Sequence, residues 1–342
     1  MPRLFVTPER SRTKRRRNMV NEFKISRRSF GAGLAALGIA PLVPRLARAA
    51  TYPDKNITYV VAAGVGGGSD ILARTVARVI EDKKLLPVTM IVENRPGGSG
   101  AIGYNYLNSH EGDASYLGGV GVSFFTTPLL GKMRYNYKSF TPLGALARSP
   151  YILVVNSGSD IKSLDDLKSA SSLRVGSVGA VADEALLSHL LNKEMGTQIR
   201  VVPYDGGGEV IGAVLGGHLD LMWGNPNEML EQVRAGKMRP LAVSAPERIK
   251  ELPEVPTFPE LGYDINHTQL RAIVMPAGVP AEAVAYWEGV LKSVAESDEW
   301  REAYLDRFNE IPLYLDSASL AKEMEATSSR YEAMMKELGL LK

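Results

Sequence analysis

The sequence contains no cysteine among its 342 residues. This absence excludes disulfide bonds, a thiol nucleophile and any metal site built on cysteine. It also leaves no residue for lipid attachment, so we expect an exported form of the chain to be free rather than lipid-anchored. Histidine is scarce as well, and the four histidines are scattered without the spacing of metal ligands: His110, His189, His218 and His267. We therefore expect no metal site.

Recognisable catalytic groupings are also missing. No Ser–His–Asp or His–acid arrangement can be read from the sequence, so we predict no catalytic residues, no bound cofactor and no enzymatic activity.

The apparent basicity of the chain is confined to its start. The whole chain has 40 Lys and Arg against 38 Asp and Glu, a net charge of +2. Residues 1–49 hold 12 of the basic and 2 of the acidic side chains, so the remainder carries a net charge of −8. A basic footprint for nucleic acid is therefore absent from the remainder, and we expect no nucleic-acid partner.

The first fifty residues have the features of an export signal. Ser26–Phe30 reads SRRSF, a twin-arginine core, and a short apolar run follows from Gly31 to Val43. Ala47-Arg48-Ala49 is a small-x-small cleavage pattern. The run is too short and too rich in glycine and alanine to span a membrane, and it lacks the periodicity of an amphipathic helix. We interpret residues 1–49 as a twin-arginine (Tat) signal peptide, with residues 1–18 as extra sequence before a start at Met19.

The stretch Ile57–Ala77 organises the rest of the chain. A β-branched apolar run, Ile57–Val61, predicts a buried strand, and the glycines that follow it predict a tight turn with φ > 0 at several positions: Gly64, Gly66, Gly67 and Gly68. Ser69 and Asp70 are suitable N-cap residues for the helix that follows. A helix N-terminus directed from such a turn is a site for an anion.

Two other interpretations of this stretch were weighed. One is a plain strand-to-helix turn with no ligand. The other is a dinucleotide fold, because Gly64-x-Gly66 follows a strand and Glu93 ends a second strand. Against it, Ser69 stands at the third glycine position, and Asp70 would lie beside a pyrophosphate.

The same strand–loop–helix plan recurs along the chain. Each half has three units, and we expect their loops to meet at the carboxyl edge of a parallel sheet, where open α/β sheets bind ligands. The expected strands are 57–61, 88–93, 116–120, 140–147, 151–156, 173–177, 200–204, 219–223, 241–244 and 271–275. Ser123 could contribute a hydroxyl; Phe124 and Phe125 form either an apolar wall or part of the core.

Two similar lobes joined by crossing strands would enclose a cleft. We predict an α/β fold in which each lobe has a mixed, mostly parallel sheet flanked by helices. The first lobe spans 50–149, the second 150–265, and the chain returns to the first at 266–342, where helices run from Ala281 to the end.

Several motifs in order resemble one family. They are YPDKNITYVVAAGVGGGSD, IVENRPGGSGAIGY, VPYDGGGEVIGAVLGGHLDLMWGNPNE and RAGKMRPLAVSAPERIKELPEVPTFPELGYD, followed by RAIVMPAGVP. They are similar to the extracytoplasmic solute-binding proteins of tripartite tricarboxylate transporters, the Bug family, and to its tricarboxylate-binding branch. The resemblance covers Thr51–Lys342. It implies a type II periplasmic-binding-protein fold, a carboxylate ligand, membrane transporter subunits as partners and a periplasmic location; we expect a monomer.

The resemblance also implies which residues bind the ligand. In the first lobe they are Gly66, Gly67, Gly68, Ser69, Asp70, Ser123 and Phe124; in the second they are Ser177, Val178, Gly179, Ala180, Asp183, Asp205 and Asn225. Asp70 and Asp183 are expected to brace loops or order water. Arg271 is either a charge partner of the ligand at the hinge or part of a structural salt bridge.

Two departures from the family pattern lie near the expected cleft. The first loop, AAGVGGGSD, lacks the usual proline, and Ala185 replaces a histidine. These departures favour a ligand other than a tricarboxylate, and Phe124, Phe125 and Trp223 suit an aromatic carboxylate. The alternatives to a transport receptor are an exported dinucleotide-dependent oxidoreductase and a sensor that presents its solute to a membrane kinase.

Overall fold

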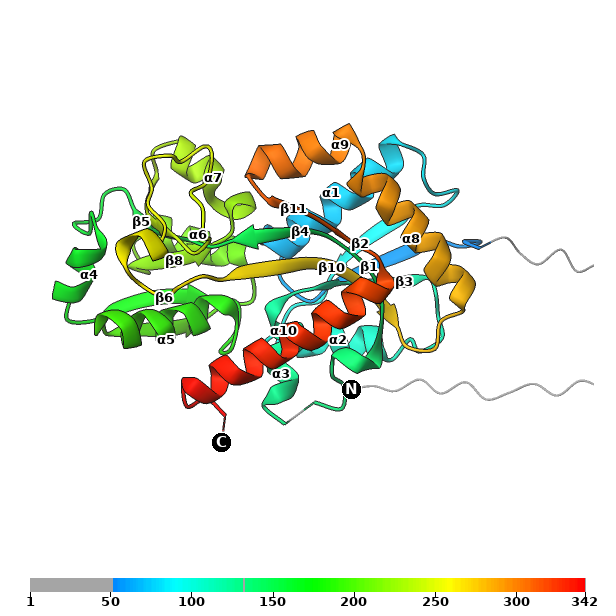
Figure 1. Cartoon of the computed structure of the whole chain (residues 1–342), viewed down its shortest axis with the longest axis horizontal. Helices are drawn as coiled ribbons and strands as arrows, with labels where there is room; N and C mark the ends of the chain where they lie inside the picture. Colours follow the sequence, from blue (N-terminus) through cyan, green and yellow to red (C-terminus); the bar gives the residue numbers. More distant parts are fainter. Residues whose placement is uncertain (1–51, 132, 342) are drawn as a thin grey trace, which may run out of the picture. The chain divides into compact units, whose positions relative to one another are not determined.

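The computed structural model describes residues 52–131 and 133–341, so the predicted signal peptide lies outside the described residues. Two β-sheets, each flanked by helices, make up this part of the chain (Figure 1). We call the first sheet with its helices the first lobe, residues 52–150 and 268–341, and the second sheet with its helices the second lobe, residues 152–265.

The first sheet has six strands in the order β11-β4-β10-β3-β1-β2. Strand β1 pairs in parallel with β2 and β3, whereas β10 is antiparallel to β3 and β4, and β11 is antiparallel to β4. The strands are β1 (Ile57–Val61), β2 (Met90–Asn94), β3 (Tyr116–Val120), β4 (Phe140–Pro150), β10 (Thr268–Pro276) and β11 (Ile311–Leu315).

The second sheet repeats this mixed design with five strands in the order β7-β6-β8-β5-β9. Strand β6 is parallel to β7 and β8, and β5 is antiparallel to β8 and β9. The strands are β5 (Ile152–Asn156), β6 (Leu173–Ser177), β7 (Ile199–Pro203), β8 (Leu221–Gly224) and β9 (Met238–Val243). The expected two-lobe α/β fold is confirmed, with more antiparallel pairing than the sequence predicted.

Helices cover both faces of each sheet, as the four buried apolar clusters show. In the first lobe, α1 and α8 pack on one face and α3 and α10 on the other. The helices are α1 (Gly68–Asp82), α2 (Ala101–Asn108), α3 (Val122–Leu129), α4 (Leu164–Ser169), α5 (Asp183–Met195), α6 (Gly207–Leu215), α7 (Pro226–Arg234), α8 (Ala281–Ala295), α9 (Asp298–Trp300) and α10 (Ser317–Glu337). Short 3-10 turns lie at Tyr137–Ser139 and Pro259–Leu261, and a π-helical segment at Arg301–Asp306. None of the helices described is long and apolar enough to cross a membrane.

Two crossing segments connect the lobes and are hydrogen-bonded to each other. Between β4 and β5, the Tyr151 amide donates to the Ser244 hydroxyl at 2.8 Å, and the Ser244 amide donates to the Tyr151 carbonyl at 2.8 Å. The His267 amide, just before β10, donates to the Ser244 carbonyl at 2.8 Å. Figure 1 shows β4 and β10 running side by side into this hinge.

The hinge is built differently from our expectation in one respect. We predicted a strand that ended at Ala147, with residues 148–150 as a connection. Strand β4 instead continues to Pro150, because Arg148, Ser149 and Pro150 all pair with β10. Residues 148–150 are therefore part of the first sheet.

The C-terminal region also differs from the prediction of helices alone. Ile311–Leu315 forms β11 at the edge of the first sheet. Its residues are exposed or half-buried and include Pro312, so the segment has little apolar signal. Proline is tolerated in an edge strand, where its missing N–H costs no ladder hydrogen bond.

A glycine fixes how closely α2 packs on the first sheet. A Cβ on Gly103 would lie 2.6 Å from the Ala62 Cα and 2.9 Å from the Arg95 carbonyl oxygen. Both are backbone atoms, so neither can move away cheaply.

We predict that Gly103→Ala lowers the free energy of unfolding by about 1–3 kcal/mol through overpacking. The control is Gly289→Ala in α8, where nothing lies within 4 Å of the new methyl group. It should raise stability by about 0.5–1 kcal/mol because alanine is the better helix former. Urea unfolding measures the free energy of unfolding of both variants. Equal changes in that free energy for Gly103→Ala and Gly289→Ala would contradict this account.

Candidate functional site

A cavity of about 60 Å³ lies between the loops of the two lobes. The carboxyl ends of parallel strands lead into it: Ala62 follows β1, Gly121 follows β3, and Val178 follows β6. Open α/β sheets place ligands at this edge. Its position between the lobes makes it the candidate binding site.

The first turns of five helices border this cavity. Residues from the beginnings of α1, α3, α5, α6 and α7 line it: Gly68, Ser69, Val122, Ser123, Glu184, Gly207 and Asn225. The first N–H groups of a helix lack partners within it, and the helix dipole adds positive potential there. The cavity is therefore suited to an anionic group.

Arg271 places a full positive charge beside these helix ends. It lies on β10 and only 1% of its surface is exposed. Its Nε donates to the Ser149 hydroxyl at 2.6 Å, and its Nη2 donates to Asn225 Oδ1 at 2.7 Å. A guanidinium has five N–H donors, so this bonding pattern within the described residues leaves donors for a ligand in the cavity that Arg271 lines.

Glu310 lies behind Arg271. The Ser149 hydroxyl donates to its carboxylate, which is buried. Burial raises the pKa of Glu310 to about 7, while the charge of Arg271 and the Ser149 hydrogen bond counteract that rise. Arg271 thus has an acidic group on the side away from the cavity.

Glu228 connects the two lobes through backbone amides. Its Oε1 accepts from the Gly68 amide at 2.6 Å, and its Oε2 accepts from the Asn225 amide at 3.0 Å. The carboxylate therefore lies at the N-termini of both α1 and α7. In this structure a carboxylate of the second lobe bonds the helix N-terminus at the first glycine loop, where the sequence predicted an anion site.

The glycine-rich loops of the two lobes meet directly. The Gly64 amide donates to the Asp205 carbonyl at 2.9 Å, and a Cβ on Gly206 would lie 2.8 Å from the Gly64 Cα. Only Gly66 of the four glycines in the first loop has positive φ, 81°. The prediction of several positive φ values was therefore wrong, and the loops need glycine mainly so that two backbones can touch.

The N-cap prediction for α1 was also wrong. Gly67 is the N-cap, and Ser69 and Asp70 lie within the first turn. Asp70 accepts from the Gly66 amide at 3.0 Å and from Arg74 Nε at 3.0 Å. These bonds, together with the charge of Arg74, hold its pKa below the usual value even though burial acts in the opposite direction. Asp70 thus braces the loop.

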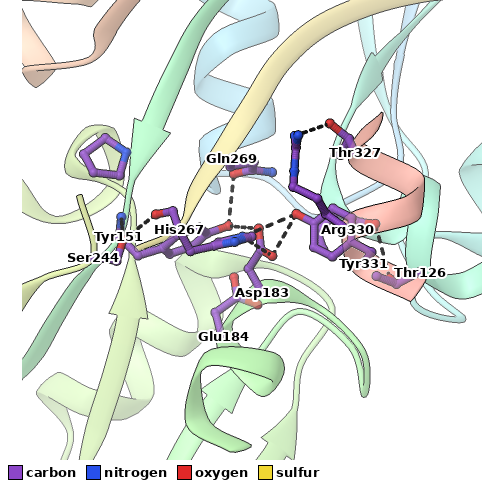
Figure 2. Close-up of polar contacts among 12 residues, drawn as sticks. Thr126, Tyr151, Asp183, Glu184, Ser244, His267, Gln269, Thr327, Arg330 and Tyr331 are labelled. Atoms are coloured by element: carbon purple, nitrogen blue, oxygen red, sulfur yellow. Dashed lines mark hydrogen bonds and ion pairs between the residues drawn. The ribbon is translucent and has the colours of Figure 1, made fainter. Parts of the chain in front are cut away.

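Asp183 is the centre of a buried network at the hinge (Figure 2). The Tyr151 hydroxyl donates to its Oδ2 at 2.8 Å, and the Tyr331 hydroxyl donates to its Oδ1 at 2.9 Å. His267 Nε2 lies 2.7 Å from the same Oδ1. The network links α5 of the second lobe to α10 of the first. Asp183 therefore stabilises the contact between the lobes.

Glu184 follows Asp183 in sequence but lines the cavity. Figure 2 shows it beside the Asp183 network and joined to none of its members. Burial, reinforced by the nearby carboxylates of Glu228 and Asp183, raises the pKa of Glu184 to about 8. Its carboxyl group is therefore mostly protonated at pH 7 while no cationic partner is nearby.

The predicted site residues fall into two groups. Those that line the cavity are Gly67, Gly68, Ser69, Ser123, Val178 and Asn225. The others lie around it or away from it: Gly66, Asp70, Phe124, Ser177, Gly179, Ala180, Asp183 and Asp205. Among these, Gly179 and Ala180 face Ser99 of the first lobe, whose hydroxyl accepts from the Ala180 amide at 3.3 Å.

The proposed aromatic wall is absent from the cavity. Phe124, Phe125 and Trp223 are buried in the apolar clusters, and Phe124 lies in α3, where we had expected a loop. Trp223 packs on Phe258 with ring centroids 5.3 Å apart. The cavity's own aromatic side chains are Tyr104 and Tyr151.

Sequence reasoning missed five polar side chains that line the cavity: Tyr104, Tyr151, Glu184, Glu228 and Gln269. Asn225 and Glu228 form a capping box, so the NPNE pattern could have drawn attention to Glu228. Its partner Gly68 is 160 positions away, which no local pattern reveals. In the described part of the chain, no group of three or more His, Asp or Glu side chains could hold a metal ion.

Comparison with known proteins identifies relatives along almost the whole chain. The family model TctC, "Tripartite tricarboxylate transporter family receptor", matches residues 72–340. A Cupriavidus necator protein described as "UPF0065 protein in gbd 5'region" is 30% identical over 324 residues, covering 93% of this chain and 98% of that protein. Protein BugT of Bordetella pertussis is 29% identical over 290 residues, covering 80% of this chain and 86% of BugT.

Solved structures agree with this result. One described as a periplasmic transporter has a TM-score of 0.79 and 28% identity, covering 85% of this chain and 99% of that one. R. palustris Rpa4515, solved with adipate, has a TM-score of 0.78 and 25% identity, covering 84% of this chain and 98% of that one.

A pair of substitutions tests the assignment of aromatic residues to core and cavity. We predict that Trp223→Phe lowers the free energy of unfolding by about 1–3 kcal/mol, because it removes buried surface and the 3.1 Å hydrogen bond from Nε1 to the Ser188 hydroxyl. Carboxylate affinity should stay within twofold. Tyr104→Phe removes a hydroxyl that lines the cavity, donates to the Gly119 carbonyl and accepts from the Gly121 amide, both at 3.1 Å. It should therefore weaken both the fold and binding. Urea unfolding and titration calorimetry test the pair, and loss of binding in Trp223→Phe would refute the assignment.

Proposed function

Because this chain belongs to the TctC family of tripartite tricarboxylate transporter receptors, we propose that it captures a small carboxylate between its lobes and delivers it to the membrane subunits of such a transporter. The carboxylate occupies the cavity bordered by five helix N-termini and Arg271. The protein binds and releases the solute without transforming it. Binding favours the closed arrangement of the lobes.

The observation that carries this proposal is the meeting of a buried arginine with several helix N-termini at one cavity. Hydrogen bonds to a charged group contribute roughly 1.5–3 kcal/mol each when water is excluded. An arginine can hold a carboxylate with two parallel N–H donors, which fixes orientation as well as affinity. A carboxylate small enough for the cavity would be held by both lobes at once.

A structural neighbour supports the ligand class. The R. palustris protein Rpa4515, which shares this fold at 25% identity, was solved with adipate, a carboxylate. Its fold alignment spans nearly its whole length. We propose the same class of ligand, a carboxylate, for this chain. The measurements below identify which carboxylate it binds.

The route to the periplasm is part of the proposal. The SRRSF motif and the small-x-small pattern at residues 47–49 support export by the twin-arginine pathway and cleavage near Ala49. We propose that the exported protein acts as a free monomer.

Ser69→Trp tests the placement of the site. Ser69 lines the cavity at the first turn of α1, so an indole there should fill it and abolish carboxylate binding. The melting temperature of the empty protein should change by only a few degrees. The matched control is Ser171→Trp at an exposed position outside the cavity, which should bind normally.

The readout is a thermal-shift screen against mono-, di- and tricarboxylates. A ligand at a hundred times its Kd stabilises by about 2.7 kcal/mol, which should raise the melting temperature by several degrees. If Ser69→Trp still responded like the unmodified protein, the carboxylate would bind elsewhere. A silent panel for the unmodified protein would refute the proposed function itself.

A further inference from the structure

The cavity contains more acidic than basic side chains. Glu184 and Glu228 line it, and Arg271 is the one cationic side chain among its lining residues in the described chain. Glu310 lies behind Arg271, joined to it through the Ser149 hydroxyl. The carboxyl groups of Glu228 and Glu310 therefore already interact with the charge of Arg271 before any ligand enters. A ligand with two or three negative charges would place more negative charge beside Glu228 than one cation offsets.

The two acidic side chains of the cavity differ in how well they are bonded. Both oxygens of Glu228 accept from backbone amides, at 2.6 and 3.0 Å. Glu184 has one side-chain contact, its Oε2 lying 3.2 Å from the Ser177 hydroxyl. That hydroxyl has a single proton, which is closer to the Gly179 carbonyl at 2.7 Å. The backbone amide of Glu184 itself is a second donor to the carboxylate. Glu184 thus faces the cavity with fewer strong donors than Glu228 has.

A half-buried carboxylate with few donors is destabilised in its charged form, and a ligand can supply further donors. An ammonium or similar cationic nitrogen would give Glu184 both a countercharge and N–H donors. The same ligand would place its carboxylate toward Arg271 and the helix N-termini.

We infer that the site selects a compound with one carboxylate and one cationic nitrogen over a di- or tricarboxylate, and that Glu184 is the residue that receives the cationic end. This inference rests on the proposed function, since it assumes a carboxylate in the same cavity.

The inference predicts that the affinities for the two ligand classes change in opposite directions with pH. Several ionisable groups surround Glu184: Tyr151, Asp183, Glu228, Arg271 and Tyr331. Burial raises the pKa of Glu184 to about 8, so at pH 6 the carboxyl group is protonated. A cationic nitrogen favours the ionised form, so its binding expels the proton and tightens as pH rises from 6 to 8. A second carboxylate favours the protonated form, so its binding weakens over the same range.

The experiment compares two matched series by titration calorimetry at pH 6, 7 and 8. One series is the ω-amino acids from glycine to 6-aminohexanoate, and the other is the α,ω-dicarboxylates of matching length, such as β-alanine against succinate. Buffers with different ionisation enthalpies report the protons released. The unmodified protein should bind its best amino acid at least tenfold more tightly than the matching diacid, with release of up to one proton at pH 7.

Glu184→Gln should lower that preference at least tenfold and abolish the proton release. The matched control is Glu194→Gln, which is exposed on the same helix α5, outside the cavity, and should leave both unchanged. Circular dichroism melts verify that both variants fold; should Glu184→Gln unfold, the pH slopes of the unmodified protein decide.

The possible failures are distinguishable. Tighter binding of diacids, or a preference that Glu184→Gln leaves intact, overturns this inference and leaves the carboxylate receptor standing. If neither series nor any other carboxylate binds, the proposed function fails and this inference fails with it.

Discussion

The Glu228 carboxylate connects the two halves of the site through backbone amides, and the contact between the lobes at the cavity depends on such bonds. It accepts from the Gly68 amide of the first lobe and the Asn225 amide of its own lobe. A Cβ on Gly207 would lie 2.4 Å from its Oε1, so the α6 loop can approach only as glycine. One half-buried carboxylate thus bonds to two helix N-termini beside a third. The positive ends of these helices offset the cost of burying its charge.

Around Glu228, some polar residues stabilise the fold and others are free to bind a ligand. Asp183, at the beginning of α5, uses both carboxylate oxygens in contacts with Tyr151, Tyr331 and His267, and these contacts stabilise the hinge. Asp70 does the same for the first loop. Arg271 and Glu184 keep unfilled hydrogen-bonding capacity on the cavity side. We expect the ligand to bind polar groups whose hydrogen bonds within the protein are incomplete, rather than groups whose hydrogen bonds are complete.

Much of the fold follows from local patterns. The runs 57–61, 116–120 and 173–177 are strands with the predicted bounds, because short apolar runs bounded by glycine turns have few alternatives. Strand β11 was missed because an exposed edge strand carries almost no apolar signal. The site was harder to predict. Its glycine loops are visible in the sequence, but the contact of Gly64 with Gly206, the bond from Gly68 to Glu228 and the burial of Phe124 depend on segments far apart in the chain.

The central claim is that a carboxylate lies between the lobes against Arg271. The most direct test is a crystal structure of the protein with the carboxylate that gives the largest thermal shift. The account predicts a carboxylate oxygen within hydrogen-bonding distance of the Arg271 guanidinium, with the ligand in contact with both lobes. A carboxylate bound in an outer groove, such as the one lined by Arg74 and Arg78 beside β2, with the interlobe cavity holding only water, would contradict it.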